Sequence, residues 1–152
     1  MPSPADFGFN DEKLLNHPTV FAPHLFTGKT VLVSGAGSGL GKATAALFGR
    51  LGATLIVCGR KPEKLAEAVE FLKLTGATVH SDTLNIREAE NVGKFMDRVF
   101  NEWGGIDVMI NNAGGQFAQA SIDFTVKGWN AVVDTNLNGT WYMMQNAARH
   151  WR

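Results

Sequence analysis

Three glycines between an apolar segment and an alanine-rich segment constrain the fold of this chain more than any other feature. Residues 31–34 read Val-Leu-Val-Ser, and Gly35, Gly39 and Gly41 follow, with a helix-forming stretch over 40–51. This order predicts a buried strand, a tight turn and a helix. The turn would gather backbone N–H groups at the positive end of the new helix, an arrangement that binds phosphate.

The spacing of these glycines separates the turn from two related phosphate-binding motifs. The phosphate loop of nucleoside triphosphatases needs a hydroxyl residue after its Gly-Lys pair, and here Ala43 follows Gly41-Lys42. The dinucleotide motif G-x-G-x-x-G also fails to fit in register, because the glycines fall as Gly-x-x-x-Gly-x-Gly. Placed between strand and helix, the turn favours a nucleotide site over a turn that serves structure alone.

Apolar strand-like segments alternate with helix-like segments along residues 28–152. We expect strands at 30–34, 54–58, 78–84 and 108–110, and helices at 40–51, 62–74, from 85–88 onward, and 126–151. This alternation predicts the α/β class, a doubly wound parallel sheet in a three-layer α/β/α arrangement with strand order 3-2-1-4. Residues 1–27 are expected to form an N-terminal extension.

The predicted strand order places two glycine-rich strand ends together. Ligands of doubly wound sheets bind at the carboxyl ends of the strands, where the strand order reverses. That point lies between the first and fourth strands, so the glycine turn would meet residues 111–115, Asn-Asn-Ala-Gly-Gly. Asn85 and Glu88 are further expected to form a capping box that opens the third helix.

The residues after the second strand bear on which nucleotide would bind. A carboxylate there would hydrogen-bond the ribose 2′-hydroxyl of NAD, but no acid occurs before Glu63. Arg60 and Lys61 stand there instead, and a guanidinium suits a phosphate dianion. These residues favour NADP(H), with NAD(H) less favoured, and a solvated cationic turn is the alternative.

Composition excludes several other classes of protein. The formal net charge is +0, so no long-range field attracts nucleic acid or anionic lipid. No apolar run is long enough to span a membrane, and no signal peptide is recognisable, so we expect a cytoplasmic or organelle-matrix protein without membrane contact. Cys58 is expected to be a buried apolar residue, and His17 and His24 have no metal-site spacing.

Three ordered motifs then resemble the short-chain dehydrogenase/reductase family. They are Ser34 with the glycine turn, Asn-Asn-Ala-Gly at 111–114, and Thr-Asn-Leu-Asn-Gly at 135–139. The resemblance runs from Gly28 to the end of the chain. It implies a Rossmann fold and hydride transfer between NAD(P) and a small-molecule substrate.

The resemblance also implies roles for individual residues. The cofactor phosphates would lie against Gly35, Ala36, Gly37, Ser38, Gly39, Leu40 and Gly41, and the 2′-phosphate at Arg60 and Lys61. The adenine would lie at Asn85 and Ile86, and the ribose at Asn112, Ala113 and Gly114. Asn136 matches the active-site asparagine that helps to hold a water in the proton relay, and an ordinary mid-helix residue is the alternative.

Within the family, residues 21–28, 114–117, 128–132 and 139–143 resemble the peroxisomal trans-2-enoyl-CoA reductases and their 2,4-dienoyl-CoA reductase relatives. This similarity implies NADPH-dependent reduction of an acyl-CoA double bond. A relative that acts on another carbonyl or alcohol could share these residues. Homo-oligomers, tetramers or dimers, are implied for the full-length protein.

The family's catalytic Ser and Tyr-x-x-x-Lys are not found in these 152 residues. Tyr142 is the only tyrosine, and Asn146 stands four positions later, so Tyr142 is expected to pack rather than to transfer protons. We therefore expect the cofactor-binding half of a longer enzyme, truncated before its fifth strand and inactive as an isolated chain. That half would leave the fourth strand unpaired and expose Trp141 with Met143 or Met144.

Two other interpretations remain open. The first is a non-catalytic nucleotide-binding module complete at Arg152. The second is a sugar-nucleotide epimerase-like protein, against which the Asn-Asn-Ala-Gly motif argues.

Overall fold

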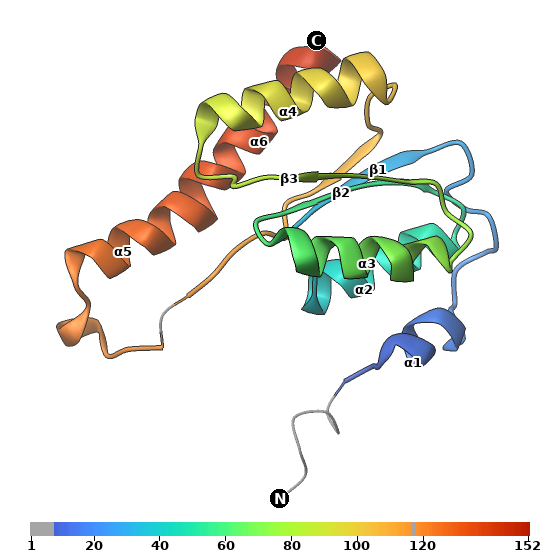
Figure 1. The fold of residues 1–152 in the computed structure, drawn as a ribbon, viewed down its shortest axis with the longest axis horizontal. Coiled ribbons are helices and arrows are strands. Elements are labelled where there is room, and N and C mark those ends of the chain that lie inside the picture. The colour runs from blue at the N-terminus through green and yellow to red at the C-terminus, as the bar shows by residue number, and fades with distance from the viewer. Residues whose placement is uncertain (1–7, 117) are drawn as a thin grey trace, which may run out of the picture.

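The computed structural model describes residues 8–116 and 118–152, in which helices alternate with a parallel sheet (Figure 1). The strands are β1 (Thr30–Ser34), β2 (Thr54–Gly59), β3 (Val79–Thr83) and β4 (Val108–Ile110). They pair in parallel in the order β3-β2-β1-β4, as the sequence predicted. Over the described residues, β4 is therefore one edge of the sheet.

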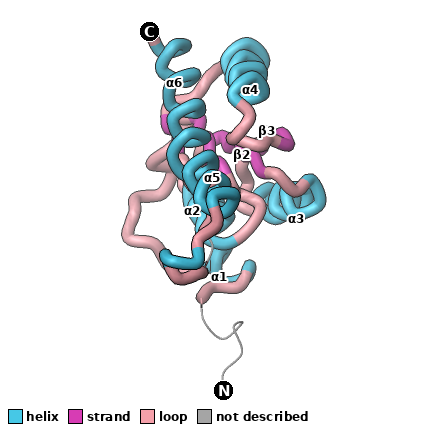
Figure 2. The backbone as a smooth tube through the Cα atoms, turned by 90° about the vertical axis from the view of Figure 1, so that its left-hand side faces the viewer, coloured by secondary structure: helices cyan, strands magenta, loops and turns pink. Residues whose placement is uncertain are grey.

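Helices cover both faces of this sheet. They are α1 (Asp11–Asn16), α2 (Gly39–Arg50), α3 (Pro62–Lys73), α4 (Ala89–Glu102), α5 (Val126–Val133) and α6 (Thr140–Trp151). In Figure 1, α2 and α3 lie on one side of the strands and α4 and α6 on the other, while α5 extends away from the sheet. Figure 2 shows the same layers from the side. The three-layer α/β/α arrangement is thus confirmed.

Strand alternation explains how one sheet supports two cores. Val31 and Val33 belong to the apolar cluster under α2 and α3, and Leu32 between them belongs to the cluster under α4 and α6. All three are fully buried. Successive side chains of a strand point to opposite faces, so a strand covered on both sides reads as continuously apolar.

Two expectations about the helices are wrong. The third helix begins at Ala89 rather than within 85–88, and no side chain caps its N-terminus. Asn85 does not form a capping box. Its Oδ1 accepts from the Arg87 N–H at 3.3 Å, its Nδ2 donates to Glu88 Oε1, and the Glu88 N–H closes a turn onto the Asn85 carbonyl. Asn85 therefore forms a local turn, as short polar side chains favour.

The helix expected over 126–151 is also not uniform. A π-helical segment, Asp134–Gly139, separates α5 from α6. Gly139 fits here because a Cβ built on it would lie 2.8 Å from Ile86 Cγ1. The close contact between Gly139 and Ile86 thus lies at the end of the π-helical segment. Such segments within α-helices often mark functional sites.

The N-terminal extension packs on α2, although residues 1–7 lie outside the described part. Asn10 caps α1, since its Oδ1 accepts from the Lys13 N–H at 2.9 Å. Lys42 Nζ then contacts both Asp11 carboxylate oxygens at 2.7 and 2.8 Å. Arg50 donates to the carbonyls of Leu14 and His17. These contacts attach α1 to the helix that follows the glycine turn.

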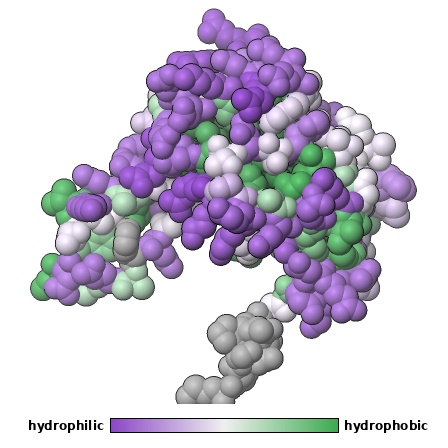
Figure 3. Space-filling view, viewed as in Figure 1, coloured by the Kyte–Doolittle hydropathy of each residue, from purple (hydrophilic) through white to green (hydrophobic). Residues whose placement is uncertain are grey.

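Apolar side chains are exposed along the outer side of the last helices. Figure 3 shows a group of apolar residues at the lower left, where Figure 1 places α5. The exposed large apolar side chains over residues 122–151 are Ile122, Val126, Trp129, Leu137, Trp141, Met144 and Trp151. Met143 is fully buried in the cluster under α4 and α6, so Met144 is the methionine that accompanies Trp141 at the surface.

Candidate functional site

The glycine turn joins β1 to α2 and is anchored to the end of β2. Gly35 has φ +71, a conformation that side chains with a Cβ rarely adopt, and its N–H donates to the Cys58 carbonyl at 2.8 Å. Ser38 is the N-cap residue of α2, but its side chain makes no capping hydrogen bond. The amide donors of the first turn of α2 are therefore left for a ligand.

The glycines at 35 and 41 are required by close packing rather than by an open cleft. A Cβ on Gly35 would lie 2.8 Å from Ala113 Cα. A Cβ on Gly41 would overlap both the Asn112 Nδ2 and the Gly35 carbonyl oxygen. Gly39, with φ +56, has no atom within 4 Å of its built Cβ, so its missing side chain leaves open space beside the turn.

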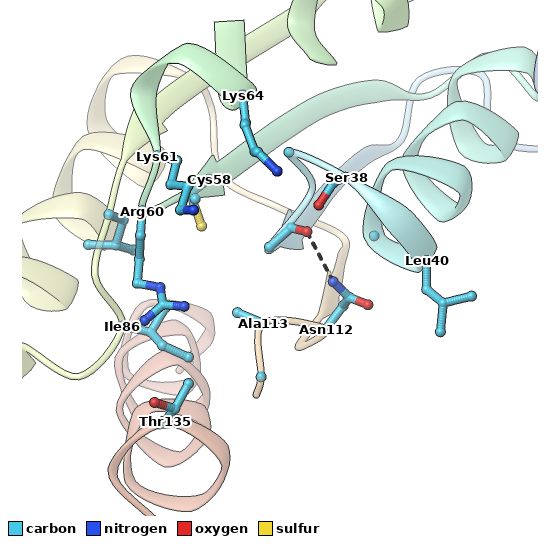
Figure 4. Close-up of a pocket in the computed structure, with 16 residues that line it drawn as sticks. Ser38, Leu40, Cys58, Arg60, Lys61, Lys64, Ile86, Asn112, Ala113 and Thr135 are labelled. Carbon is cyan, nitrogen blue, oxygen red and sulfur yellow. Dashed lines mark hydrogen bonds between the residues drawn. The ribbon is translucent and has the colours of Figure 1, made fainter. Parts of the chain in front are cut away.

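The end of β4 is hydrogen-bonded to the end of β1. Asn112 Nδ2 donates to the Ser34 carbonyl at 3.0 Å and to the Gly35 carbonyl at 3.2 Å, the bond drawn in Figure 4. The Ala113 N–H donates to Ser34 Oγ at 3.0 Å. The two glycine-rich strand ends therefore meet at the point of strand reversal, where the sequence analysis expected a ligand site.

These elements surround a cavity of about 420 Å³. It brings together most of the residues expected to bind cofactor: Gly35, Gly37, Ser38, Leu40, Gly41, Arg60, Lys61, Ile86, Asn112, Ala113 and Gly114. Three expected residues do not line it. Ala36 is buried in the core, Gly39 lies in the turn beside it, and Asn85 is engaged in its own turn.

Five residues of the cavity wall were not predicted from the sequence. They are Cys58, Gly59, Lys64, Leu84 and Thr135. Leu84 precedes two residues that were expected at the adenine, and Gly59 precedes Arg60, so adjacency could have identified both. Lys64 carries no such signal, because a lysine in the first turn of a helix normally faces solvent.

The charges on the cavity wall are all positive. Arg60, Lys61 and Lys64 line it, and no Asp or Glu is among the lining residues. No ion pair to these three side chains occurs over residues 8–116 and 118–152. Figure 4 shows the Arg60 guanidinium above Ile86 and the Lys64 side chain extending from α3 toward the turn that carries Ser38. Such a site suits an anionic group.

Cys58 is part of the wall of the same cavity, and its side chain is buried. Cys58 is buried at the end of β2. Burial raises the pKa of this thiol from 9.0 to about 12, against the lowering effect of a hydrogen bond from the Gly35 backbone N–H to the thiol. The thiol therefore stays protonated at neutral pH, as expected for a buried apolar residue.

Asn136 lies in the π-helical segment, with its side chain bound to the loop after β4. Its Oδ1 accepts from the Gly115 N–H at 3.0 Å, and its Nδ2 donates to the Gly115 carbonyl at 2.7 Å. A Cβ on Gly114 would lie 2.6 Å from Asn136 Oδ1. Asn136 does not line the cavity, so its described contacts position the loop that carries Gly114.

Tyr142 packs beside the cluster under α4 and α6, with its ring edge-on to Trp141 at 5.8 Å between centroids. Over the described ranges, no group of three or more His, Cys, Asp or Glu side chains is placed to hold a metal ion. Nor is any helix there long and apolar enough to cross a membrane.

The fold and the cavity define a dinucleotide-binding protein of the Rossmann class. The family model for the short chain dehydrogenases matches residues 29–152. The chain therefore belongs to the short-chain dehydrogenase/reductase family of oxidoreductases, which bind NAD(P).

Known relatives agree with this assignment. The Bacillus subtilis (strain 168) protein named "Probable 2,4-dienoyl-CoA reductase" is 34% identical over 123 residues, which are 81% of this chain and 48% of the relative. The citronellol catabolism dehydrogenase AtuB of Pseudomonas aeruginosa PAO1 superposes with a TM-score of 0.82 at 33% identity, covering 87% of this chain and 54% of that one. The chain thus spans about half the length of the relatives that it matches.

Structures with either nicotinamide cofactor resemble this chain. An NAD+-bound xylitol dehydrogenase has a TM-score of 0.80 at 29% identity, covering 82% of this chain and 48% of its own. An actinorhodin polyketide ketoreductase with NADPH has a TM-score of 0.76 at 28% identity, covering 85% and 49%. The fold therefore accommodates both cofactors, and the choice between them depends on side chains of this chain.

Proposed function

We propose that this protein is an NADP-dependent oxidoreductase that transfers a hydride to an enoyl-CoA or carbonyl substrate. Residues 28–152 form the Rossmann domain, which is the cofactor-binding half of this enzyme, and residues 1–27 form an N-terminal extension. The observation that carries the proposal is the cavity at the strand reversal, which has a glycine turn on one wall, three cations without an acid on the other, and a volume of about 420 Å³.

The residues of the cavity support the binding of four parts of the cofactor: the pyrophosphate, the 2′-phosphate, the adenine and the ribose. The open space beside Gly39 and the uncapped start of α2 suit the pyrophosphate. Arg60 and Lys61 would hold the 2′-phosphate, Ile86 and the neighbouring Asn85 would border the adenine, and residues 112–114 would border the ribose. When bound, the nicotinamide supplies the hydride.

Asn136 is proposed to serve the active site by positioning and by helping to hold a water. Its side chain makes two hydrogen bonds to the backbone of Gly115. Its own backbone carbonyl lies in the π-helical segment. Carbonyls in such segments are common hydrogen-bond acceptors for water.

The substrate part of the proposal rests on the relatives. The Bacillus subtilis relative carries the name of a dienoyl-CoA reductase, so an acyl-CoA double bond is the first substrate class to test. The exposed Trp141 and Met144 suit a contact between subunits, so we propose a homo-oligomer, either a dimer or a tetramer. We also propose that the protein is located in the cytoplasm or in an organelle matrix.

The proposal is tested by following NADPH consumption with 2,4-dienoyl-CoA, trans-2-enoyl-CoA and simple carbonyl substrates. The full-length protein should turn over at least one of them with NADPH and far more slowly with NADH. Arg60→Asp should reverse the cofactor preference, because a carboxylate repels the 2′-phosphate and accepts from a 2′-hydroxyl. Arg149→Gln, at an exposed position on α6, is the matched control. Equal rates with both cofactors in the wild type would contradict the proposal.

A nucleotide-binding module without turnover is the second candidate. It is favoured by the packing of Tyr142, the only tyrosine of these 152 residues, beside the core and not on the cavity wall. Tight NADPH binding without consumption for any substrate class, in the full-length protein, would support this candidate.

A further inference from the structure

We infer that Lys64 is a specificity-determining residue for NADP(H), whose ammonium group binds the 2′-phosphate from the side opposite Arg60. This inference rests on the proposed NADP dependence and extends it to a helix that the sequence motifs did not include.

The start of α3 places Lys64 on the cavity wall. Leu65, the next residue, is buried in the core at 4% exposure, and its N–H donates to the Lys61 carbonyl at 3.0 Å to open the helix. Because Leu65 faces the core, the first turn of α3 is fixed against the sheet. Lys64 Cβ lies 3.6 Å from a Cβ built on Gly37, so the base of its side chain stands directly beside the glycine turn.

The side chains of Arg60 and Lys64 point to different parts of the cavity. In Figure 4 the Arg60 guanidinium lies above Ile86, on the side expected for the adenine, and the Lys64 ammonium group points toward the turn with Ser38. A 2′-phosphate beside the adenine ribose would have Arg60 on one side. Its oxygens on the other side would face Lys64 and the Ser38 hydroxyl.

Lys64 is electrostatically available for this role. Other lysines of the chain make ion pairs, such as Lys73 with Glu70 at 2.7 Å on the same helix. Lys64 has none over the described residues, although Glu63 and Glu67 are near in sequence. A phosphate monoester carries about two negative charges at pH 7, so the Lys64 ammonium group adds binding energy to that of Arg60 and Lys61.

The same geometry predicts selectivity and not merely affinity. NADH presents an uncharged hydroxyl where NADP(H) presents the phosphate, so the Lys64 charge contributes little to NADH. Removing the charge should weaken NADPH about tenfold, the size of one charge-assisted hydrogen bond, and leave NADH within about twofold.

The test is calorimetric titration of the purified protein with NADPH and with NADH, for the wild type, Lys64→Gln, Lys64→Arg and Lys73→Gln. Lys64→Gln should lose roughly tenfold affinity for NADPH alone, Lys64→Arg should retain it, and Lys73→Gln, at the far end of α3, should change neither. The thermal unfolding midpoint of each variant checks that folding is intact.

The possible outcomes distinguish a failure of the proposed role of Lys64 from a failure of the proposed NADP dependence. If the wild type binds NADH as tightly as NADPH, the proposed NADP dependence fails and the role of Lys64 fails with it. If the wild type prefers NADPH and Lys64→Gln keeps that preference unchanged, or loses both cofactors equally, only the role of Lys64 is overturned.

Discussion

Replacing Gly41 by alanine should destabilise the junction between β1, α2 and β4. The added Cβ would overlap Asn112 Nδ2 and the Gly35 carbonyl oxygen, and the carbonyl oxygen cannot yield without moving the backbone of the turn. Asn112 Nδ2 also makes the bonds to the Ser34 and Gly35 carbonyls that hold the two strand ends together. The substitution therefore affects both the turn and the loop after β4.

The magnitude follows from three terms. Overpacking a rigid site costs about 1–3 kcal/mol, and weakening the two Asn112 bonds costs about 1 kcal/mol each. Alanine within a helix regains roughly 0.5–1 kcal/mol over glycine. The net loss is about 2–4 kcal/mol, which lowers the unfolding midpoint of a domain of this size by roughly 5–15 °C.

Differential scanning calorimetry measures this loss, and Gly37→Ala is the matched control. A Cβ on Gly37 meets its nearest atoms at 3.6 Å, an ordinary contact, and Gly37 is not among the positive-φ glycines. Gly37→Ala should therefore stay within about 0.5 kcal/mol of the wild type in stability. Equal unfolding midpoints for the two variants would refute the close packing of Gly41 against the loop after β4.

Three further predictions concern single side chains. Asp107 accepts hydrogen bonds from Lys29 Nζ and from the Thr30 N–H, and these bonds lower the pKa of its carboxyl. Its contribution to stability is therefore present above its ordinary pKa near 4 and is lost as the pH falls through its lower folded pKa. Asp107→Asn should reduce this loss of stability at acid pH, and an unchanged dependence of stability on acid pH would contradict the prediction. The Cys58 thiol, with its pKa raised to about 12 by burial, should resist iodoacetamide at pH 8 until urea unfolds the protein, and rapid native labelling would argue against its burial. Tyr142→Phe should leave NADPH affinity and any turnover of the full-length protein within about twofold of wild type, because the ring packs beside the core; a loss of turnover with unchanged binding would assign the hydroxyl a chemical role.

The parts of the fold that the sequence predicted share one cause. Strands covered on both faces require continuous apolar runs, and Val31, Leu32 and Val33 show that pattern plainly. The strand order then followed from the alternation of elements, because parallel crossovers are right-handed and permit few arrangements. The glycine turn was predictable for a similar reason, since residues with a Cβ rarely adopt the positive φ found at Gly35.

The parts that were not predicted depend on tertiary contacts. The sequence Asn85-Ile-Arg-Glu88 fits a capping box and also fits a turn, and the packing of Ile86 against Gly139 accompanies the turn. The π-helical segment ends at the contact between Gly139 and Ile86. Local helix propensity does not reveal this tertiary contact, so the sequence predicted one continuous helix. Lys64 was missed because its role depends on α3 lying beside Gly37, a proximity that the spacing of residues along the chain does not reveal.

The most direct test of the central claim is competitive binding of 2′,5′-ADP and 5′-AMP to the purified protein. These two ligands differ only by the 2′-phosphate, which isolates the contribution of the cationic wall formed by Arg60, Lys61 and Lys64. We expect 2′,5′-ADP to bind at least tenfold more tightly than 5′-AMP, and added salt to reduce this difference. Equal affinity for the two ligands, or no binding of either, would contradict it.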